Sequence, residues 1–182
     1  MNANTGILIL IPYPSSIGFA IGRLISAFLR VGSRAVGSVE NVHFCFSELD
    51  GPCRFLPEGF QRVIAADAYR GNMDEFERIG KYVRENSIQC VFALDLPVQA
   101  RCLSSLRRNG VRTVISYWGA PMSSINRGLR LLMKRLEVRY LRRSRPDLFV
   151  FESQAMRALA VQGRGVPLES TVVISSVPTL IE

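Results

Sequence analysis

The loop after the first apolar segment has residue types that could hold a phosphate group or a sugar hydroxyl. Residues 7–11 are wholly apolar, and an amphipathic pattern begins after "PYPSSIG". A helix that begins there offers free backbone N–H groups and a partial positive charge to a ligand near Ser16, Ile17 and Gly18. The loop matches neither G-x-G-x-x-G nor a P-loop. The alternative is a simple turn with Ser15 or Ser16 as the helix cap.

Acidic residues end two later apolar segments. Asp95 ends "CVFALD", where a carboxylate could bind an acceptor hydroxyl or act as a base. The alternative for Asp95 is a cap on the following helix. Glu152 ends "DLFVFE" and Ser153 follows it. Both are candidate acceptor-binding residues, and the simplest alternative for Ser153 is the N-cap of the next helix.

Two aromatic residues end a further apolar segment, "RTVISYW". Tyr117 and Trp118 could stack on a sugar ring or on an apolar chain at the wall of a pocket. They could equally close the edge of the hydrophobic core. The sequence does not decide between these two interpretations, and it singles out no catalytic residue.

A basic helix is predicted over residues 125–143. At 100° per residue, one side gathers the expected core stripe: Leu129, Leu132, Met133, Leu136 and Tyr140. The broadly opposite side gathers cations around two apolar residues: Arg127, Leu131, Lys134, Arg135, Val138 and Arg142. Basic residues around exposed apolar ones suit an anionic membrane surface or another anionic partner. The alternative is an ordinary solvated helix.

Apolar runs alternate with amphipathic stretches along the whole chain. Residues 38–46, "SVENVHFCF", are predicted to form one of the strands. The alternating order predicts an α/β fold with a doubly wound, mostly parallel, Rossmann-like sheet and helices on both faces. Ligands of such sheets sit at the carboxyl ends of the strands. We expect one domain over residues 1–175, followed at 176–182 by the start of a linker or a tail.

Local signals within the helices are specific enough to test. Asn72 is predicted to cap a helix in a capping-box pattern with Glu75. The inner face of this helix is predicted to consist of Phe76, Ile79, Gly80 and Val83. Gly32 is predicted to end the first helix. Gly22 is predicted to let that helix pack tightly on the sheet, and Pro97 is placed in the first turn of a later helix.

Composition narrows the classes of partner. The 182 residues carry a net charge of +8 and are 48% apolar, as in a globular protein that favours anionic partners. One histidine, His43, and four cysteines without a C-x-x-C pair make a metal site improbable. No cofactor motif is found. Nucleic acid is not expected, because no binding motif is present and aromatic residues are not interleaved with the basic patch. No run is long enough to span a membrane.

Two stretches resemble the amino-terminal domain of the family-four glycosyltransferases, which have the two-domain B-type fold. Residues 7–32, "ILILIPYPSSIGFAIGRLISAFLRVG", resemble its first strand, loop and helix. Residues 142–175 resemble a later strand that ends in a serine, then a helix, a G-x-P turn and a last strand. The sequence departs from the family at 117–119, where many relatives have a histidine, and at "SSVPT", where an Asn-Gly-Val-Asp-like turn is common.

The resemblance implies an acceptor-side domain that uses a nucleotide sugar and a glycan or lipid-linked acceptor. It places Ser16, Ile17 and Gly18 beside the donor diphosphate. It also implies a second, nucleotide-sugar-binding domain, which could belong to a separate chain, and little activity without it. The expected location is cytoplasmic, with possible peripheral contact at the inner face of the cell membrane. The competing interpretation is a non-catalytic module that docks on an anionic membrane or a partner protein.

Overall fold

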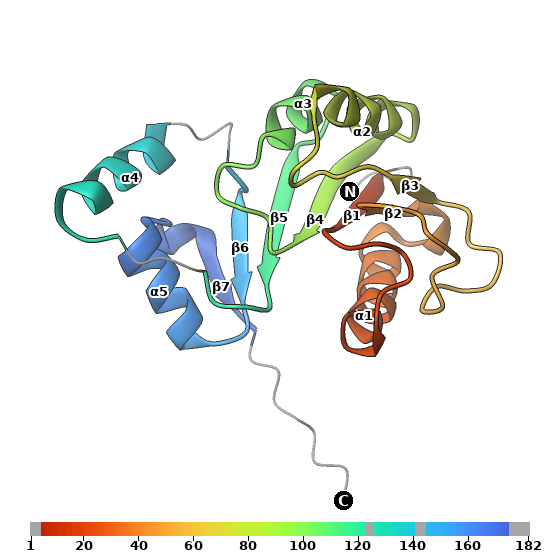
Figure 1. The fold of residues 1–182 in the computed structure, drawn as a ribbon, viewed down its shortest axis with the longest axis horizontal. Coiled ribbons are helices and arrows are strands. Elements are labelled where there is room, and N and C mark those ends of the chain that lie inside the picture. Colours follow the sequence, from red (N-terminus) through yellow and green to blue (C-terminus); the bar gives the residue numbers. More distant parts are fainter. Residues whose placement is uncertain (1–4, 123–125, 141–144, 175–182) are drawn as a thin grey trace, which may run out of the picture.

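The computed structural model describes residues 5–122, 126–140 and 145–174, and it contains a seven-stranded, wholly parallel sheet within those ranges (Figure 1). The strand order is β3-β2-β1-β4-β5-β6-β7. The strands are β1 (Gly6–Ile11), β2 (Val42–Phe46), β3 (Val63–Ala65), β4 (Ile88–Leu94), β5 (Thr113–Trp118), β6 (Leu148–Phe151) and β7 (Thr171–Val173). The helices are α1 (Phe19–Val36), α2 (Met73–Glu85), α3 (Cys102–Arg108), α4 (Gly128–Tyr140) and α5 (Gln154–Arg164), with short 3-10 turns η1 (Val39–Asn41) and η3 (Leu168–Ser170). The predicted doubly wound fold is confirmed.

The central strand β1 is buried on both faces, and its alternate residues enter different cores. Leu8 and Leu10 belong to the core beneath α2 and α3, whereas Ile7 and Ile9 belong to the core beneath α1. Figure 1 shows α2 and α3 on one side of the sheet and α1 on the other. This arrangement follows from right-handed crossovers, because the chain moves from β1 toward β2 in one direction and from β4 toward β7 in the other.

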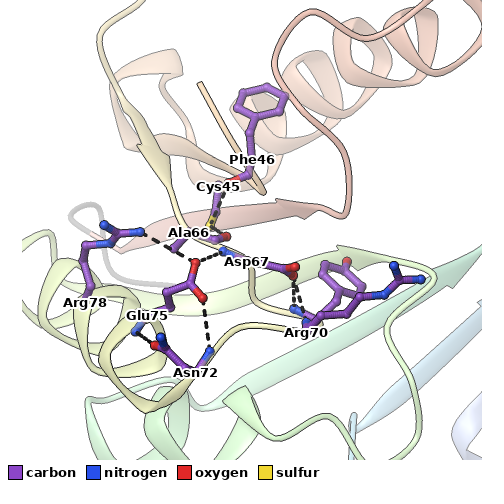
Figure 2. A network of polar contacts seen from close by, with 9 residues as sticks. Cys45, Phe46, Ala66, Asp67, Arg70, Asn72, Glu75 and Arg78 are labelled. Atoms are coloured by element: carbon purple, nitrogen blue, oxygen red, sulfur yellow. Dashed lines mark hydrogen bonds and ion pairs between the residues drawn. The ribbon is translucent and has the colours of Figure 1, made fainter. Parts of the chain in front are cut away.

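The turn from β3 into α2 is held by the capping box that the sequence predicts (Figure 2). The Asn72 side chain accepts from the backbone N–H of Glu75 at 3.1 Å, and Glu75 Oε2 accepts from the Asn72 N–H at 3.1 Å. Glu75 Oε1 also accepts from the N–H of Asp67 at 3.0 Å, and Arg78 lies 3.9 Å from the same oxygen. One carboxylate therefore joins the start of α2 to the end of β3.

The expected roles of two glycines in α1 are wrong. The helix continues past Gly32 and ends at Gly37, whose φ of +76° is the left-handed conformation that favours glycine. Gly32 instead gives close approach to β2, since an added Cβ would lie 3.3 Å from Val42 Cγ2. Gly22 instead makes room for the ring of Phe55, from the β2–β3 connection. An added Cβ on Gly22 would meet this ring and not the sheet.

Two further boundaries differ from the expectation. The segment 38–46, predicted as one strand, begins with the 3-10 turn η1 before β2. The helix expected to start at Pro97 starts only at Cys102, after a run of turns. Both cases reflect local turns that the apolar pattern does not reveal. The predicted domain boundary at 175 and the tail 176–182 lie outside the described residues.

The helix α4 presents the opposite face from the one predicted. The expected core stripe is exposed: Leu129 73%, Leu132 52%, Met133 63%, Leu136 46% and Tyr140 80%. Val138, expected beside the surface cations, is buried at 3% exposure, and Leu131 is half-buried. The physical reason is position, because α4 packs against α5 and lies at the margin of the molecule (Figure 1).

The cations of the same predicted face have different environments. Arg127 and Arg135 are exposed, while Lys134 is half-buried. Arg142 lies outside the described residues. The basic face is therefore only partly the surface that the sequence predicts.

Candidate functional site

The sheet reverses its winding between β1 and β4, which is where ligands bind in folds of this kind. Tyr69, in the β3–α2 connection, fixes the carboxyl ends of these two strands. Its hydroxyl lies 2.6 Å from the carbonyl oxygen of Leu94 and 3.2 Å from that of Leu10. Burial raises the pKa of Tyr69 well above its ordinary value, so the group stays a neutral donor.

No motif in the sequence predicts this role for Tyr69. The one available signal is local. Asp67 accepts from the backbone N–H groups of Tyr69 and Arg70, at 2.8 and 2.9 Å, which is a common turn pattern for aspartate (Figure 2). The contact with the ends of β1 and β4 is not encoded in any short motif.

The loop after β1 is organised by Asp50, from the β2–β3 connection. The Asp50 carboxylate accepts from the backbone N–H of Ser16 at 2.9 Å, and it also bonds the Ser16 hydroxyl. The Ser15 hydroxyl lies 3.1 Å from the same carboxylate and 2.6 Å from the carbonyl oxygen of Gly51. These hydrogen bonds lower the pKa of Asp50, the largest contribution coming from the Ser16 side chain.

The predicted donor-loop residues therefore have three different environments. Ser16 is already bonded to Asp50, and Ile17 packs against the core under α1. Gly18 is the N-cap of α1, so neither serine is the cap, and among the described residues no side-chain hydrogen bond caps this end. An added Cβ on Gly18 would meet none of the described atoms within 4 Å. The space over Gly18 is open to a ligand, whereas an anion beside Ser16 would meet the Asp50 charge.

Asp95 stands at the carboxyl end of β4 in a left-handed backbone conformation, with φ of +54°. It does not cap α3, whose N-cap position is Arg101. Its carboxylate instead accepts from the backbone N–H of Gly119, at 3.1 Å, in the loop that follows β5. Burial raises the pKa of Asp95 above its ordinary value, and the nearby Glu152 charge adds to this.

Tyr117 and Glu152 come together at the ends of β5 and β6. The Tyr117 hydroxyl bonds Glu152 Oε1, and burial followed by this bond raises the pKa of the tyrosine. The Tyr117 ring packs with Phe28 and Phe92, with ring centroids 5.6 and 5.9 Å away. The ring thus closes the core edge, as one of the two interpretations held, while its hydroxyl reaches the carboxyl edge of the sheet.

Trp118 points to the opposite face from Tyr117 and joins the small core beneath α5. It lines a cavity of about 380 Å³ together with Val98 and Met122 and with Lys134 and Val138 of α4. The indole Nε1 is buried without a hydrogen-bond partner in the described part of the chain. Trp118 therefore lines this cavity with Lys134 and Val138 of the basic helix, and it does not join the group around Asp95.

Ser153 has the role of a helix cap, as its simplest interpretation held. Its Oγ accepts from the backbone N–H of Met156 at 3.2 Å at the start of α5. The hydroxyl hydrogen is still able to point outward, next to Glu152. Of the five candidate acceptor-binding residues, the structure thus groups Asp95, Tyr117, Glu152 and Ser153 on three adjacent strand ends.

The polar groups at these strand ends have chemistry that suits contact with hydroxyl groups. The two carboxylates can accept hydrogen bonds from hydroxyl groups, whereas the Tyr117 hydroxyl already donates its hydrogen to Glu152. Asp95, whose pKa is raised, is a suitable proton acceptor from such a hydroxyl. Among the described residues, no group of three or more histidine, cysteine or acidic side chains is arranged to hold a metal ion.

The fold is similar to that of a known enzyme. A solved structure of a glycosyltransferase from Rickettsia africae ESF-5 superposes with a TM-score of 0.60 and 10% sequence identity, over 94% of this chain and 43% of that one. This chain therefore spans less than half the length of that enzyme. At such low identity the similarity shows the fold. No protein-family model and no curated protein sequence matches the chain.

Proposed function

We propose that this chain is the acceptor-side domain of a two-domain glycosyltransferase. It would help to transfer a sugar from a nucleotide sugar to a glycan or lipid-linked acceptor in the cytoplasm. The observation that carries the proposal is the group Asp95, Tyr117 and Glu152 at the strand ends beside the winding reversal. The superposition on 43% of a glycosyltransferase supports it.

In this proposal the loops on the two sides of the winding reversal, after β1 and after β4, have different functions. The open backbone at Gly18 approaches the diphosphate of the donor, and the Asp50 carboxylate holds the loop in place. Asp95 and Glu152 bind acceptor hydroxyls, and Asp95 takes up the proton of the attacking hydroxyl if the reaction inverts the sugar carbon. Half of a cleft cannot exclude water from the donor, so turnover requires the second domain.

An open apolar cavity supports the need for a further polypeptide. It has a volume of about 600 Å³ and lies between α1 and the strands β4 and β5. Its lining includes Phe28, Val31, Phe92 and Ile115, and Val31 is 65% exposed. Parallel sheets of this class are normally covered on both faces. We assign this cavity to an apolar segment of the polypeptide that supplies the nucleotide-sugar-binding domain.

The competing function, a non-catalytic docking module, differs in its response to nucleotide sugars. The test is an NMR titration of the isotopically labelled chain with millimolar UDP- and GDP-sugars. We expect weak binding, no turnover, and amide shifts concentrated at Gly18 and Gly119. Absence of any shift at millimolar concentration, or shifts confined to other regions, would refute the proposal.

Two variants sharpen this titration. Gly18→Val should fold, since the added side chain meets no described atom, and should lose the shifts because it fills the space over the loop. Ser104→Val adds a similar side chain at an exposed position of α3 and should bind like the unmodified chain. Equal binding by both variants would show that the first loop is only structural.

A further inference from the structure

The exposed side of α4 is a continuous apolar stripe. We define the α4 stripe as five residues that recur at helical spacing: Leu129, Leu132, Met133, Leu136 and Tyr140. All five are exposed, and three of them by more than 60%. Figure 1 shows α4 at the margin of the molecule, beyond α5. Isolated exposed apolar residues are ordinary, but a stripe along the whole length of a helix marks a contact surface.

The orientation of the α4 stripe is fixed by packing on the other side of the helix. Val138 is buried at 3% exposure and, with Lys134, lines the cavity beside Trp118. The backbone of Arg135 lies against Gly165, where an added Cβ would be 3.1 Å from the Arg135 nitrogen. Before the helix, the Asn126 N–H donates to the carbonyl oxygen of Gly163 at 2.8 Å. Rotation of α4 to hide the stripe would break these contacts.

Cations lie on both flanks of the α4 stripe. At 100° per residue, Arg130 is about 100° to one side of Leu129 and Arg135 about 120° to the other. Both arginines are exposed, as is Arg127 just before the helix. The whole chain has a net charge of +8. An apolar stripe with an exposed arginine on each flank is typical of a helix that lies in the interface of an anionic bilayer.

We propose that α4 binds the surface of an anionic lipid bilayer, with the α4 stripe inserted among the lipid chains and Arg130 and Arg135 at the headgroups. The helix lies flat and does not span, because 13 residues extend only about 20 Å against a hydrocarbon core of about 30 Å. Within the part of the chain that the structure describes, no helix is long and apolar enough to cross a membrane. This inference does not depend on the proposed sugar transfer.

The test is co-sedimentation of the full 182-residue chain with lipid vesicles. Vesicles of phosphatidylcholine alone are compared with vesicles that contain phosphatidylglycerol, at low salt and in 1 M salt. We expect binding to the anionic vesicles, little to the neutral ones, and weakening in 1 M salt, where screening shortens to about 3 Å. Failure to bind anionic vesicles at low salt would overturn the proposal.

The apolar part of the contact is tested by a matched pair of double variants. Leu132→Ser with Met133→Ser removes two members of the α4 stripe and should abolish binding to anionic vesicles. Leu49→Ser with Met73→Ser removes two exposed apolar side chains elsewhere and should leave binding unchanged. Circular dichroism checks that both variants are folded. If the two variants bind equally well, the stripe is not the lipid contact.

The charged part is tested by a second matched pair. Arg130→Gln with Arg135→Gln should weaken binding about thirtyfold, from the contribution of each cation near an anionic surface. Arg84→Gln with Arg108→Gln removes the same charge from exposed positions on α2 and α3, and should weaken binding much less. Equal losses would indicate nonspecific attraction by net charge and would overturn the role of α4.

A protein partner is the main alternative occupant, and the simplest one is a second copy of the chain. Sedimentation equilibrium decides this without lipid. We expect a monomer both for the unmodified chain and for the Leu132→Ser, Met133→Ser variant. A dimer that is lost in this variant would assign the α4 stripe to self-association and overturn membrane binding.

Discussion

The helices α2 and α4 each have 13 residues, yet sequence periodicity predicts the buried face of one correctly and inverts the other. In α2 the predicted inner residues Phe76, Ile79, Gly80 and Val83 are all buried. In α4 the five predicted inner residues are all exposed. The apolar residues of α2 form one stripe, whereas α4 has a long stripe on one side and Leu131 and Val138 on the other.

Periodicity determines the inner face of a helix only where a single face is apolar and the helix lies over the sheet. The helix α2 packs on β4 and α3, so every turn of it has a neighbour to bury against. The helix α4 contacts α5 near Gly165 and reaches the core mainly through Val138. A short contact of this kind selects the smaller stripe and leaves the larger one in solvent.

The largest expected effect is the loss of a core residue from α2. Phe76 is 1% exposed, and Phe76→Ala should lower the free energy of unfolding by about 3–5 kcal/mol, because the lost burial is joined by the cost of a cavity. Urea unfolding followed by circular dichroism measures this change. A loss below 1 kcal/mol would break the contrast with α4, since it would mean that α2 is also weakly attached.

The second prediction concerns pH and the contact of α2 with β2. The hydroxyl of Tyr82, in α2, lies 2.8 Å from Nδ1 of His43, in β2. Burial, followed by the charge of Arg62, lowers the pKa of this histidine to about 4. The unfolded chain takes up this proton near pH 6.5, so stability should fall as pH decreases from 6.5 to 4, by at most about 3 kcal/mol. Above pH 6.5 this group should cause no change.

Measurement of unfolding between pH 4 and 8 tests this dependence, with His43→Gln as the control that removes the titrating group. The free energy of unfolding of this variant should depend much less on pH below pH 6.5. If the stability of the variant depends on pH as steeply as that of the unmodified chain, other groups cause the loss of stability in acid, and the contact of His43 with Tyr82 does not.

The third and smaller effect is the loss of the capping box. Asn72→Ala removes the side-chain acceptor for the N–H of Glu75 and should cost about 1 kcal/mol of stability. Asn72→Asp keeps an acceptor at the N-terminus of a helix and should cost less. Thermal unfolding compares the two variants. Equal melting temperatures would show that the helix start is held by Glu75 and Asp67 alone.

The smallest expected effect is on the exposed side of α4. Leu136→Ala should change stability by no more than about 0.5 kcal/mol, because the side chain is 46% exposed. Val138→Ala removes fewer atoms but buried ones, and it should cost more. Urea unfolding of this pair tests the orientation of α4 directly, and the reverse order would restore the orientation that the sequence predicts.

Sequence patterns alone predict the α/β class, the parallel sheet, the positions of the main strands and the capping box at Asn72. These features depend on neighbours within a few residues, through apolar runs, helical spacing and local hydrogen bonds. For the same reason the sequence offers the helix cap as the simplest role of Ser153, and the structure shows that cap. The placement of Asp95 and Glu152 at strand ends followed from the general rule for parallel sheets.

Tertiary structure alone decided the contacts between distant segments. Asp50 bonds Ser16, which is 34 residues away in the sequence, and Tyr69 bonds Leu94, which is 25 residues away. No local sequence motif predicts either contact. Distant segments also select the buried face of α4, because that face depends on where α5 and Trp118 lie. A helix with apolar residues on two sides has two possible inner faces of similar hydrophobicity, and only the surface that it meets in the folded chain selects one of them.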